Sequence, residues 1–244
     1  MTRALLLLPG LARFCKDFDS QLEALVNAQV DWNLCLWDHS HAQDTRISPG
    51  FEQVNADTVR ARVEPLLPLN HSIRHLEVLD RALAPQPPRE YTAFYANPPA
   101  LWAQFSLLKY AAQRVDFNDY DLVIRSRCDI GLDHELDLTS IHEQLLNSAA
   151  GTIVMPDNER RGPNDLCDQF AIGLPKDMQV YCSVIDHIDR VYTNGCPFNP
   201  EYLVGHILHE QALTWPRTGF NIQLRAQGHH VPGHFHPDFG RWLR

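Results

Sequence analysis

The chain has 244 residues, 44% of them hydrophobic and 21% charged, and its formal net charge is −9. This length and balance suit one soluble domain over residues 1–244. The negative charge excludes a general polyanion-binding surface, so we expect no nucleic-acid partner and expect any phosphate recognition to be confined to a pocket.

The chain shows neither a membrane span nor a disulfide framework. No segment approaches the roughly 20 apolar residues needed to cross a bilayer. The apolar run at residues 4–8 is shorter than the roughly 7–15 residues of a signal peptide, so we interpret it as a first strand. The 6 cysteines are scattered without a Cys-x-x-Cys pair, which indicates reduced thiols and predicts a cytoplasmic protein. Peripheral attachment at the inner face of a membrane stays open.

Helix-like and strand-like segments then alternate along the chain. After the strand at 4–8 we expect a helix at 18–28, strands at 30–37 and near 63–67, and a helix at 72–83 with Ser72 as its N-cap. A proline-rich loop at 84–89 follows. The later segments are, in order, a helix at 98–115, a strand at 121–129, a helix at 139–147, strands at 151–155 and 169–173, helices at 178–192 and 201–213, and a strand at 220–224. This alternation predicts an α/β fold with a mostly parallel central sheet flanked by helices.

The strand expected at 121–129 has an unusual carboxyl end. Its apolar centre is followed by Arg125, Arg127 and Asp129. Because side chains alternate along a strand, we expect these three groups on one face. Ligands of open α/β sheets bind beyond the carboxyl ends of the strands, and two guanidinium groups beside a carboxylate suit an anionic ligand and a metal ion. The alternative is a surface ion-pair cluster where the strand leaves the sheet.

The turn after the first strand offers a second phosphate contact. Gly10 and Arg13 follow the apolar run, and a glycine turn with a nearby arginine can direct backbone N–H groups and a guanidinium towards a phosphate. A tight turn with a solvated arginine explains the residues equally well. The dinucleotide fingerprint Gly-x-Gly-x-x-Gly and the P-loop lysine are both missing from the sequence.

Two further segments carry carboxylates. Asp165 and Asp168 precede the strand expected at 169–173, where a carboxylate can orient a hydroxyl group or act as a base. The alternative for Asp165 is a simple turn. Glu201 follows Pro200 near the start of a helix, where the helix dipole alone explains an acidic residue.

Histidines near the end of the chain suggest a competing metal site. His206 and His209 are spaced as helix neighbours, and His234, His236 and Asp238 are spaced as neighbours on one extended face. A metal-dependent hydrolase or oxygenase would use these groups. The alternative is a solvated, frayed tail.

An ordered set of short motifs extends over about residues 4–215. The set comprises Gly10-Leu-Ala-Arg13, the aromatic-ended strand at 30–37, a helix with Gln104, Lys109 and Tyr110, the string from Tyr120 to Asp129, Asp168-Gln-Phe-Ala-Ile-Gly173, and Asn199-Pro-Glu201. It resembles a family of bacterial and viral glycosyltransferase-like proteins of the GT-A fold that are associated with surface-polysaccharide synthesis. The resemblance implies a hexosyltransferase that moves a sugar from a nucleotide-sugar donor to a glycan or lipid-linked acceptor.

The resemblance also implies roles for individual residues. GT-A enzymes typically hold Mn²⁺ or Mg²⁺ with an Asp-x-Asp motif, which here reads Arg127-Cys128-Asp129. Only Asp129 matches this motif, and the resemblance implies that it is a catalytic residue and a contact to the metal ion or the ribose. Arg125 or Arg127 would supply part of the positive charge that the metal ion otherwise provides. The implied donor side comprises residues 1–130, with Gly10, Arg13, Arg125, Arg127 and Asp129. The implied acceptor side comprises residues 131–244, with Asp168 as base or orienting group beside Asp165, Gln169 and Glu201. His234 and His236 would complete a metal shell together with Asp129. A non-catalytic nucleotide-sugar-binding protein is a third alternative, and the oligomeric state stays open.

Overall fold

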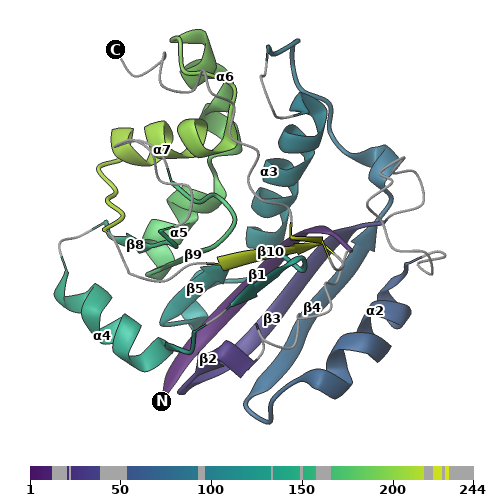
Figure 1. The fold of residues 1–244 in the computed structure, drawn as a ribbon, viewed down its shortest axis with the longest axis vertical. Helices are drawn as coiled ribbons and strands as arrows, with labels where there is room; N and C mark the ends of the chain where they lie inside the picture. Colours follow the sequence, from purple (N-terminus) through teal and green to yellow (C-terminus); the bar gives the residue numbers. More distant parts are fainter. Residues whose placement is uncertain are drawn as a thin grey trace.

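The computed structural model describes residues 1–12, 21, 23–38, 54–92, 97–132, 134–148, 151–157, 166–216, 222–226 and 229–230. A central sheet organises these residues (Figure 1). Its strands, in spatial order, are β4 (His71–Leu79), β3 (Ala28–Trp37), β1 (Thr2–Leu11), β5 (Leu122–Arg125), β9 (Ala171–Gly173) and β8 (Ile153–Val154). The first four strands are parallel, and β9 is antiparallel to both of its neighbours. The fold is therefore α/β with a mostly parallel sheet.

Helices cover both faces of this sheet. One face packs against α3 (Pro98–Ala112), α5 (Pro175–Cys182), α6 (Ile185–Thr193) and α7 (Pro200–Glu210). The other packs against α2 (Ala56–Val63) and α4 (Leu138–Asn147). Short 3₁₀ turns occupy Glu64–Leu66, Arg81–Leu83 and Phe117–Asp119.

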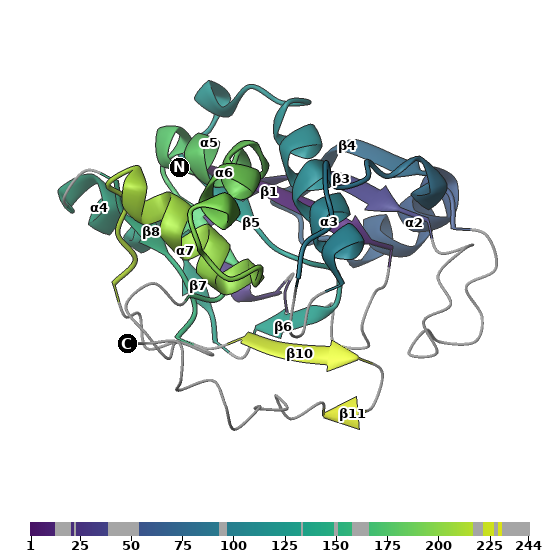
Figure 2. The ribbon, with the colours of Figure 1, turned by 90° about the horizontal axis from the view of Figure 1, so that it is seen from above.

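Two small sheets complete the fold. The strands β2 (Leu25–Val26) and β7 (Leu136–Asp137) form a parallel pair. In the other sheet, β6 (Ile130–Leu132) pairs antiparallel with β10 (Ile222–Ala226), which pairs with β11 (His229–His230). Figure 2 shows β10 alongside β6, on the side of the molecule away from α5 and α6. Among the described residues, no helix combines the length and the apolar character that a membrane crossing requires.

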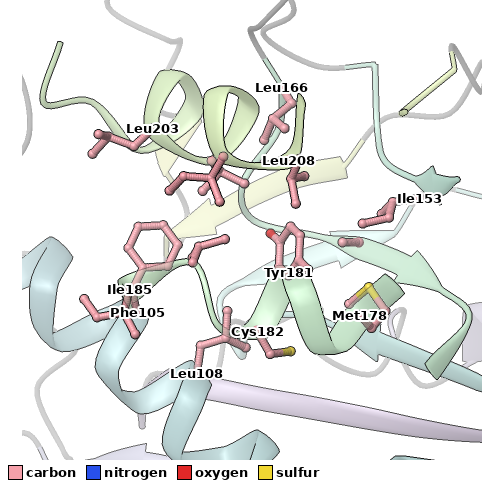
Figure 3. Close-up of a cluster of buried hydrophobic side chains, with 14 of the residues drawn as sticks. Phe105, Leu108, Ile153, Leu166, Met178, Tyr181, Cys182, Ile185, Leu203 and Leu208 are labelled. Carbon is pink, nitrogen blue, oxygen red and sulfur yellow. The ribbon is translucent and has the colours of Figure 1, made fainter. Parts of the chain in front are cut away.

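The central strand β1 is buried on both faces. Leu5 and Leu7 pack into the cluster under α3 and α5, whereas Leu6 and Leu8 pack into the cluster on the opposite face. A parallel strand covered on both sides is expected to be continuously apolar, and the leucine run satisfies both cores at once. Figure 3 shows the first of these clusters, with Tyr181 at its centre between α5 and α7.

The helices α3 and α7 begin in the same way. Asn97 and Asn199 are their N-caps, and each side-chain oxygen accepts a hydrogen bond from a backbone N–H in the first turn, at 3.4 and 3.3 Å. Pro98 and Pro200 follow the caps, in the first turn where proline loses no helical hydrogen bond. The start of α7 at Pro200 confirms the helix predicted there.

Asp31 is the centre of a buried ionic network on β3. Its side chain is 1% exposed, and its carboxylate accepts hydrogen bonds from Arg3 at 2.8 Å, Ser72 at 2.7 Å and Tyr120 at 3.2 Å. Arg74 lies 3.3 Å away. Burial alone would raise the pKa of Asp31, but the bonds from Ser72 and Arg3, together with the charges of Arg74 and Arg3, hold the pKa below the ordinary 3.8.

We expect Asp31→Asn to lower the free energy of unfolding by about 1–2 kcal/mol at neutral pH, because charge-assisted hydrogen bonds to partly exposed arginines are lost. A lowered folded pKa means that the carboxylate stabilises the fold fully above the unfolded value. This contribution is lost as the pH falls through the folded value. The difference between parent and variant should therefore shrink below about pH 3.8. Urea unfolding at neutral and acidic pH measures it, and a difference independent of pH would contradict the assignment.

The structure corrects several sequence predictions. Residues 72–83 contain most of β4 rather than a helix, and residues 63–67 end a helix and form a 3₁₀ turn rather than a strand. The end of the helix predicted at 18–28 is also wrong, because β2 begins at Leu25. β4 is an edge strand with mostly half-buried side chains, so it lacks the continuous apolar run of a buried parallel strand.

Candidate functional site

The order of the strands creates a switch point at β1. The chain places β3 and β4 on one side of β1 and then returns through α3 to place β5 on the other side. Ligands of such sheets bind where the order reverses, beyond the carboxyl ends of the strands. Leu7 pairs with Arg125, the last residue of β5, so β1 continues beyond its neighbour.

Pro9 and Gly10 belong to this extension of β1. The backbone carbonyl of Leu7 accepts from Ser126 N at 2.9 Å, so alternate residues of β1, including Pro9, direct their backbone towards the side of β5. Because β5 has ended there, a proline without an N–H interrupts no ladder. The prediction that the strand ends before Gly10 is wrong, since β1 reaches Leu11 and Gly10 pairs with Leu36 of β3.

A buried glutamine holds the short connection from β5 to β6. Gln21 is fully buried, and its amide nitrogen donates to the carbonyls of Arg127 and Ile130, each at 3.0 Å. Its carbonyl oxygen accepts from the Ser126 hydroxyl at 2.5 Å. Gln21 therefore holds in place the backbone segment that contains Arg127 and Asp129. Sequence reasoning missed it, because a single glutamine in an amphipathic segment carries no signal of long-range contact.

Arg127 and Asp129 form a two-pronged ion pair in this connection. Arg127 donates from Nε and Nη2 to the two carboxylate oxygens of Asp129, both at 2.8 Å. The side chains are 21% and 15% exposed. Burial alone would lower the pKa of Arg127, but the charges of Asp129 and Asp168 raise it above the ordinary value. The guanidinium thus stays charged in a largely desolvated position, where it attracts anions strongly.

Asp168 completes the arrangement from the other side. It is 4% exposed, and its carboxylate accepts a hydrogen bond from Gln104 of α3 at 3.2 Å. Its backbone carbonyl accepts from the Tyr181 hydroxyl at 2.9 Å. Burial raises the pKa of Tyr181, so the hydroxyl remains a donor. We call Arg125, Arg127, Asp129, Asp168, Gln104 and Tyr181 the β5-end cluster.

Arg125 is the most unusual member of the β5-end cluster. Its side chain is fully buried, and its three guanidinium nitrogens have no hydrogen-bond partner among the described residues. Its positive charge acts on Tyr181 and Cys182 of α5 and opposes the increase in pKa that burial causes in both. The prediction that Arg125, Arg127 and Asp129 share one face of a strand is wrong, because β5 ends at Arg125 and a turn follows.

Besides Asp168, two residues predicted on the acceptor side lie within the described structure. Gln169 follows Asp168 and is half-buried, with a side-chain oxygen that has no hydrogen-bond partner among the described residues. Glu201 is half-buried in the first turn of α7, where the helix dipole stabilises its charge. The acceptor-side role of Gln169 and Glu201 therefore stays a prediction.

The competing histidine site is not assembled by the described residues. His206 and His209 are both exposed on α7, so a metal held there would need ligands from elsewhere. Four predicted site residues lie outside the described residues: Arg13, Asp165, His234 and His236. Asp238, which belongs to the same tail, lies outside them as well.

Among the described residues, one group of three gathers potential metal ligands. Cys35, His75 and Glu77 each offer a ligand atom, and these atoms lie within 4.8 Å of one another. The group lies on β3 and β4 and includes neither Asp129 nor Asp168.

Comparison with known proteins finds solved structures of similar fold but no similar sequence. No family model matches the chain, and no curated protein sequence is similar to it. The crystal structure of mouse xyloside xylosyltransferase 1 in its apo form superposes with a TM-score of 0.47 at 10% sequence identity. The superposition covers 89% of this chain and 85% of the mouse protein.

Proposed function

We propose that the protein is a glycosyltransferase that moves a sugar from a nucleotide-sugar donor to a glycan or lipid-linked acceptor. The observation that supports this proposal is the convergence of acidic and basic side chains in the β5-end cluster, beside the switch point of the sheet. In this proposal residues 1–130 form the donor side and residues 131–244 the acceptor side.

The main electrostatic demand of such a transfer is the negative charge of the departing nucleoside diphosphate. Arg127 is suited to meet it, because a planar guanidinium can turn from Asp129 to phosphate oxygens and form two parallel hydrogen bonds. Asp129 would then accept a hydrogen bond from a ribose hydroxyl. Arg125, whose charge acts on Tyr181, would add positive charge to the site.

A divalent ion at Asp129 fits the described residues less well. Both of its carboxylate oxygens accept hydrogen bonds from Arg127, and no group of three potential ligands forms around it among those residues. Mg²⁺ and Mn²⁺ prefer several oxygen ligands. In this proposal the arginines, rather than a metal ion, balance the negative charge of the phosphates. The metal shell of Asp129 with His234 and His236 is tested by the metal-ion arms of the screen below.

Asp168 would act on the acceptor. A carboxylate that is 4% exposed and held by Gln104 has a fixed direction, which a base requires to take the proton of an acceptor hydroxyl as the new bond to the sugar forms. The amide of Gln104 would keep one carboxylate oxygen engaged, leaving the other for the hydroxyl.

The first test is a thermal-shift screen against UDP-, GDP-, CMP- and dTDP-sugars, each with and without Mn²⁺. The proposal predicts a shift with one nucleotide class without Mn²⁺, followed by release of the leaving nucleotide when an acceptor is added: a nucleoside diphosphate from UDP-, GDP- or dTDP-sugars, and CMP from a CMP-sugar. A shift that requires Mn²⁺ would restore the metal role of Asp129. Binding without turnover would support a non-catalytic nucleotide-sugar-binding protein. A shift with Zn²⁺ or Fe²⁺ alone that is lost in His234→Ala/His236→Ala would favour the histidine site.

We expect Arg127→Lys to weaken donor binding by about tenfold, because lysine keeps the charge but loses the two-pronged geometry. Isothermal titration with the donor found in the screen measures the change. Arg190→Lys is the matched control: Arg190 of α6 also forms a two-pronged pair, with Glu210 of α7, but this pair is exposed at the surface. Equal donor affinity in parent and Arg127→Lys would remove Arg127 from the phosphate site.

A further inference from the structure

A second polar cluster joins β3 and β4 on the α3 side of the sheet. In the parallel register, Asn33 lies opposite His75 and Cys35 lies opposite Glu77. Because side chains alternate along strands, these four residues share one face. The C-terminal part of α3 covers this face, and the Tyr110 hydroxyl donates a hydrogen bond to Glu77 there. We call Cys35, His75, Glu77 and Tyr110 the β3–β4 cluster.

The three potential ligands of this cluster form a typical set for zinc. A thiolate, an imidazole and a carboxylate all ligate Zn²⁺, at about 2.3, 2.0 and 2.0–2.2 Å respectively. Tetrahedral geometry then places the donor atoms about 3.3–3.7 Å apart. His75 Nε2 already lies 3.4 Å from Glu77 Oε2, and all three ligand atoms lie within 4.8 Å of one another. Small side-chain movements would complete the geometry.

The surroundings already orient two of the ligands. The Tyr110 hydroxyl lies 3.0 and 2.9 Å from the two carboxylate oxygens of Glu77, and Cys35 Sγ donates to Asn33 Oδ1 at 3.3 Å. Asn33 is itself held, because its amide donates to the Ala111 carbonyl at 2.9 Å. Such outer contacts are characteristic of protein metal sites, where they fix the ligands.

The third ligand has an unused nitrogen. His75 Nε2 is buried and, among the described residues, has no hydrogen-bond partner beyond its 3.4 Å approach to Glu77 Oε2, although the His75 side chain as a whole is 31% exposed. Cys35 is fully buried, whereas the Glu77 side chain is 32% exposed. The cluster therefore has a protein-filled inner side and an outer side that solvent can reach, as a site with three protein ligands and one bound water requires.

We propose that Cys35, His75 and Glu77 bind one zinc ion per chain, with water as the fourth ligand. The Cys35 thiol loses its proton to solvent as the sulfur–metal bond forms. Before metal binding the thiol is protonated, since burial and the nearby Glu77 raise the pKa of Cys35 to about 12. The bound ion would tie β4, the edge strand, to β3. This site is separate from the β5-end cluster and does not depend on the proposed transfer reaction.

Cobalt(II) provides the decisive probe, because it replaces zinc and gives a thiolate-to-metal charge-transfer band only when a cysteine is bound. The full chain, first freed of metal with a chelator, is titrated with Co²⁺ and followed by absorption. The expected result is one Co²⁺ per chain with this band, displaced by Zn²⁺. No band in the parent protein would overturn the proposal.

Variants separate this site from the other thiols and histidines of the chain. Cys35→Ser should abolish the band, whereas Cys196→Ser, which removes another buried thiol, should keep it. His234→Ala/His236→Ala should also keep it, because imidazoles give no thiolate band. A band that persists in Cys35→Ser would overturn the proposal. His75→Gln changes a partly exposed residue and should lose the band with the fold intact, as circular dichroism would verify.

Two neighbouring residues give opposite predictions for affinity. Tyr110→Phe removes the bonds that orient Glu77 and should weaken Co²⁺ binding by about 10–100-fold. Arg114 is exposed and its guanidinium lies 4.2 Å from the Tyr110 ring, so its charge repels a cation in the cluster. Arg114→Gln should therefore tighten binding. Equal affinity in parent, Tyr110→Phe and Arg114→Gln would show that the metal lies elsewhere.

Discussion

Replacement of Arg125 by methionine is expected to make the folded protein more stable and the proposed sugar transfer slower. Arg125 is fully buried and its guanidinium nitrogens have no hydrogen-bond partner among the described residues. An uncompensated buried charge costs free energy, and apolar replacement of buried charged groups often stabilises a protein by about 1–4 kcal/mol. Methionine is unbranched and adapts to the space left by the arginine. For a chain of this size we expect the thermal midpoint to rise by about 2–4 °C per kcal/mol.

The same variant should lower the transfer rate by about 10²–10³-fold, as loss of a preorganised charge does in other enzymes. The opposite signs of the two effects are the diagnostic result, because a protein keeps a costly buried charge when function requires it. Thermal unfolding and turnover with the identified donor measure the two effects. Lower stability in Arg125→Met would contradict this reasoning, and full turnover would remove Arg125 from the site.

Arg127→Met is the matched control for stability. It also removes a guanidinium from this region, but Arg127 is paired with Asp129. Its loss removes both hydrogen bonds that the mostly buried Asp129 carboxylate receives from Arg127, so the free energy of unfolding should fall by about 3 kcal/mol. Two arginines in one short segment are thus expected to change stability in opposite directions when replaced by the same residue.

Asp168→Asn should lower the rate of transfer by about 10²–10⁴-fold, the usual contribution of a general base. Asparagine has nearly the same shape, and its side-chain oxygen can still accept from Gln104. The Tyr181 bond goes to the backbone carbonyl and is unaffected by the change. We therefore expect the fold and the affinity for the donor to change little. Steady-state kinetics with donor and acceptor, alongside donor titration, separate these quantities.

Asp177→Asn is the control for Asp168→Asn. Asp177 is 3% exposed in the first turn of α5, so it is as deeply buried as Asp168 but lies outside the β5-end cluster. We expect it to keep full turnover. Full turnover in Asp168→Asn as well would show that Asp168 has a structural role only.

The sequence was sufficient to predict the buried strands and the helices with clear amphipathic patterns. The strand predicted at 30–37 is β3, and the helices predicted from residues 98 and 139 are α3 and α4, each within a few residues of its predicted ends. These segments could be predicted because a single hydrophobic pattern, that of a strand or that of a helix, dominates each of them. In β4, Ile73, Leu76 and Leu79 follow a helical spacing, although pairing with β3 places them in a strand. The local sequence pattern carries no information about the pairing of β4 with β3.

The candidate site was predictable only in part for a related reason. Arg127, Asp129 and Asp168 stood out because charged residues flanked apolar runs, and the structure places them in one cluster. The burial of Arg125 was not predictable, since the point at which β5 ends depends on its neighbours. Cys35, His75 and Glu77 come together only through the register of β3 with β4, and no spacing in the sequence encodes that register.

The central position of β1 has a consequence for synthesis of the protein. Its leucine run is synthesised well before its partner β5, because the pairing of Ala4 with Leu122 joins residues far apart in the chain. At about 5–20 residues per second, β5 follows β1 by roughly 6–24 s. β3 is made much sooner and can occupy one edge of β1, but the other edge and one apolar face wait for β5 and the helices after it. The nascent chain therefore presents an aggregation-prone leucine segment for seconds, which makes it a natural client for chaperones that bind extended apolar segments.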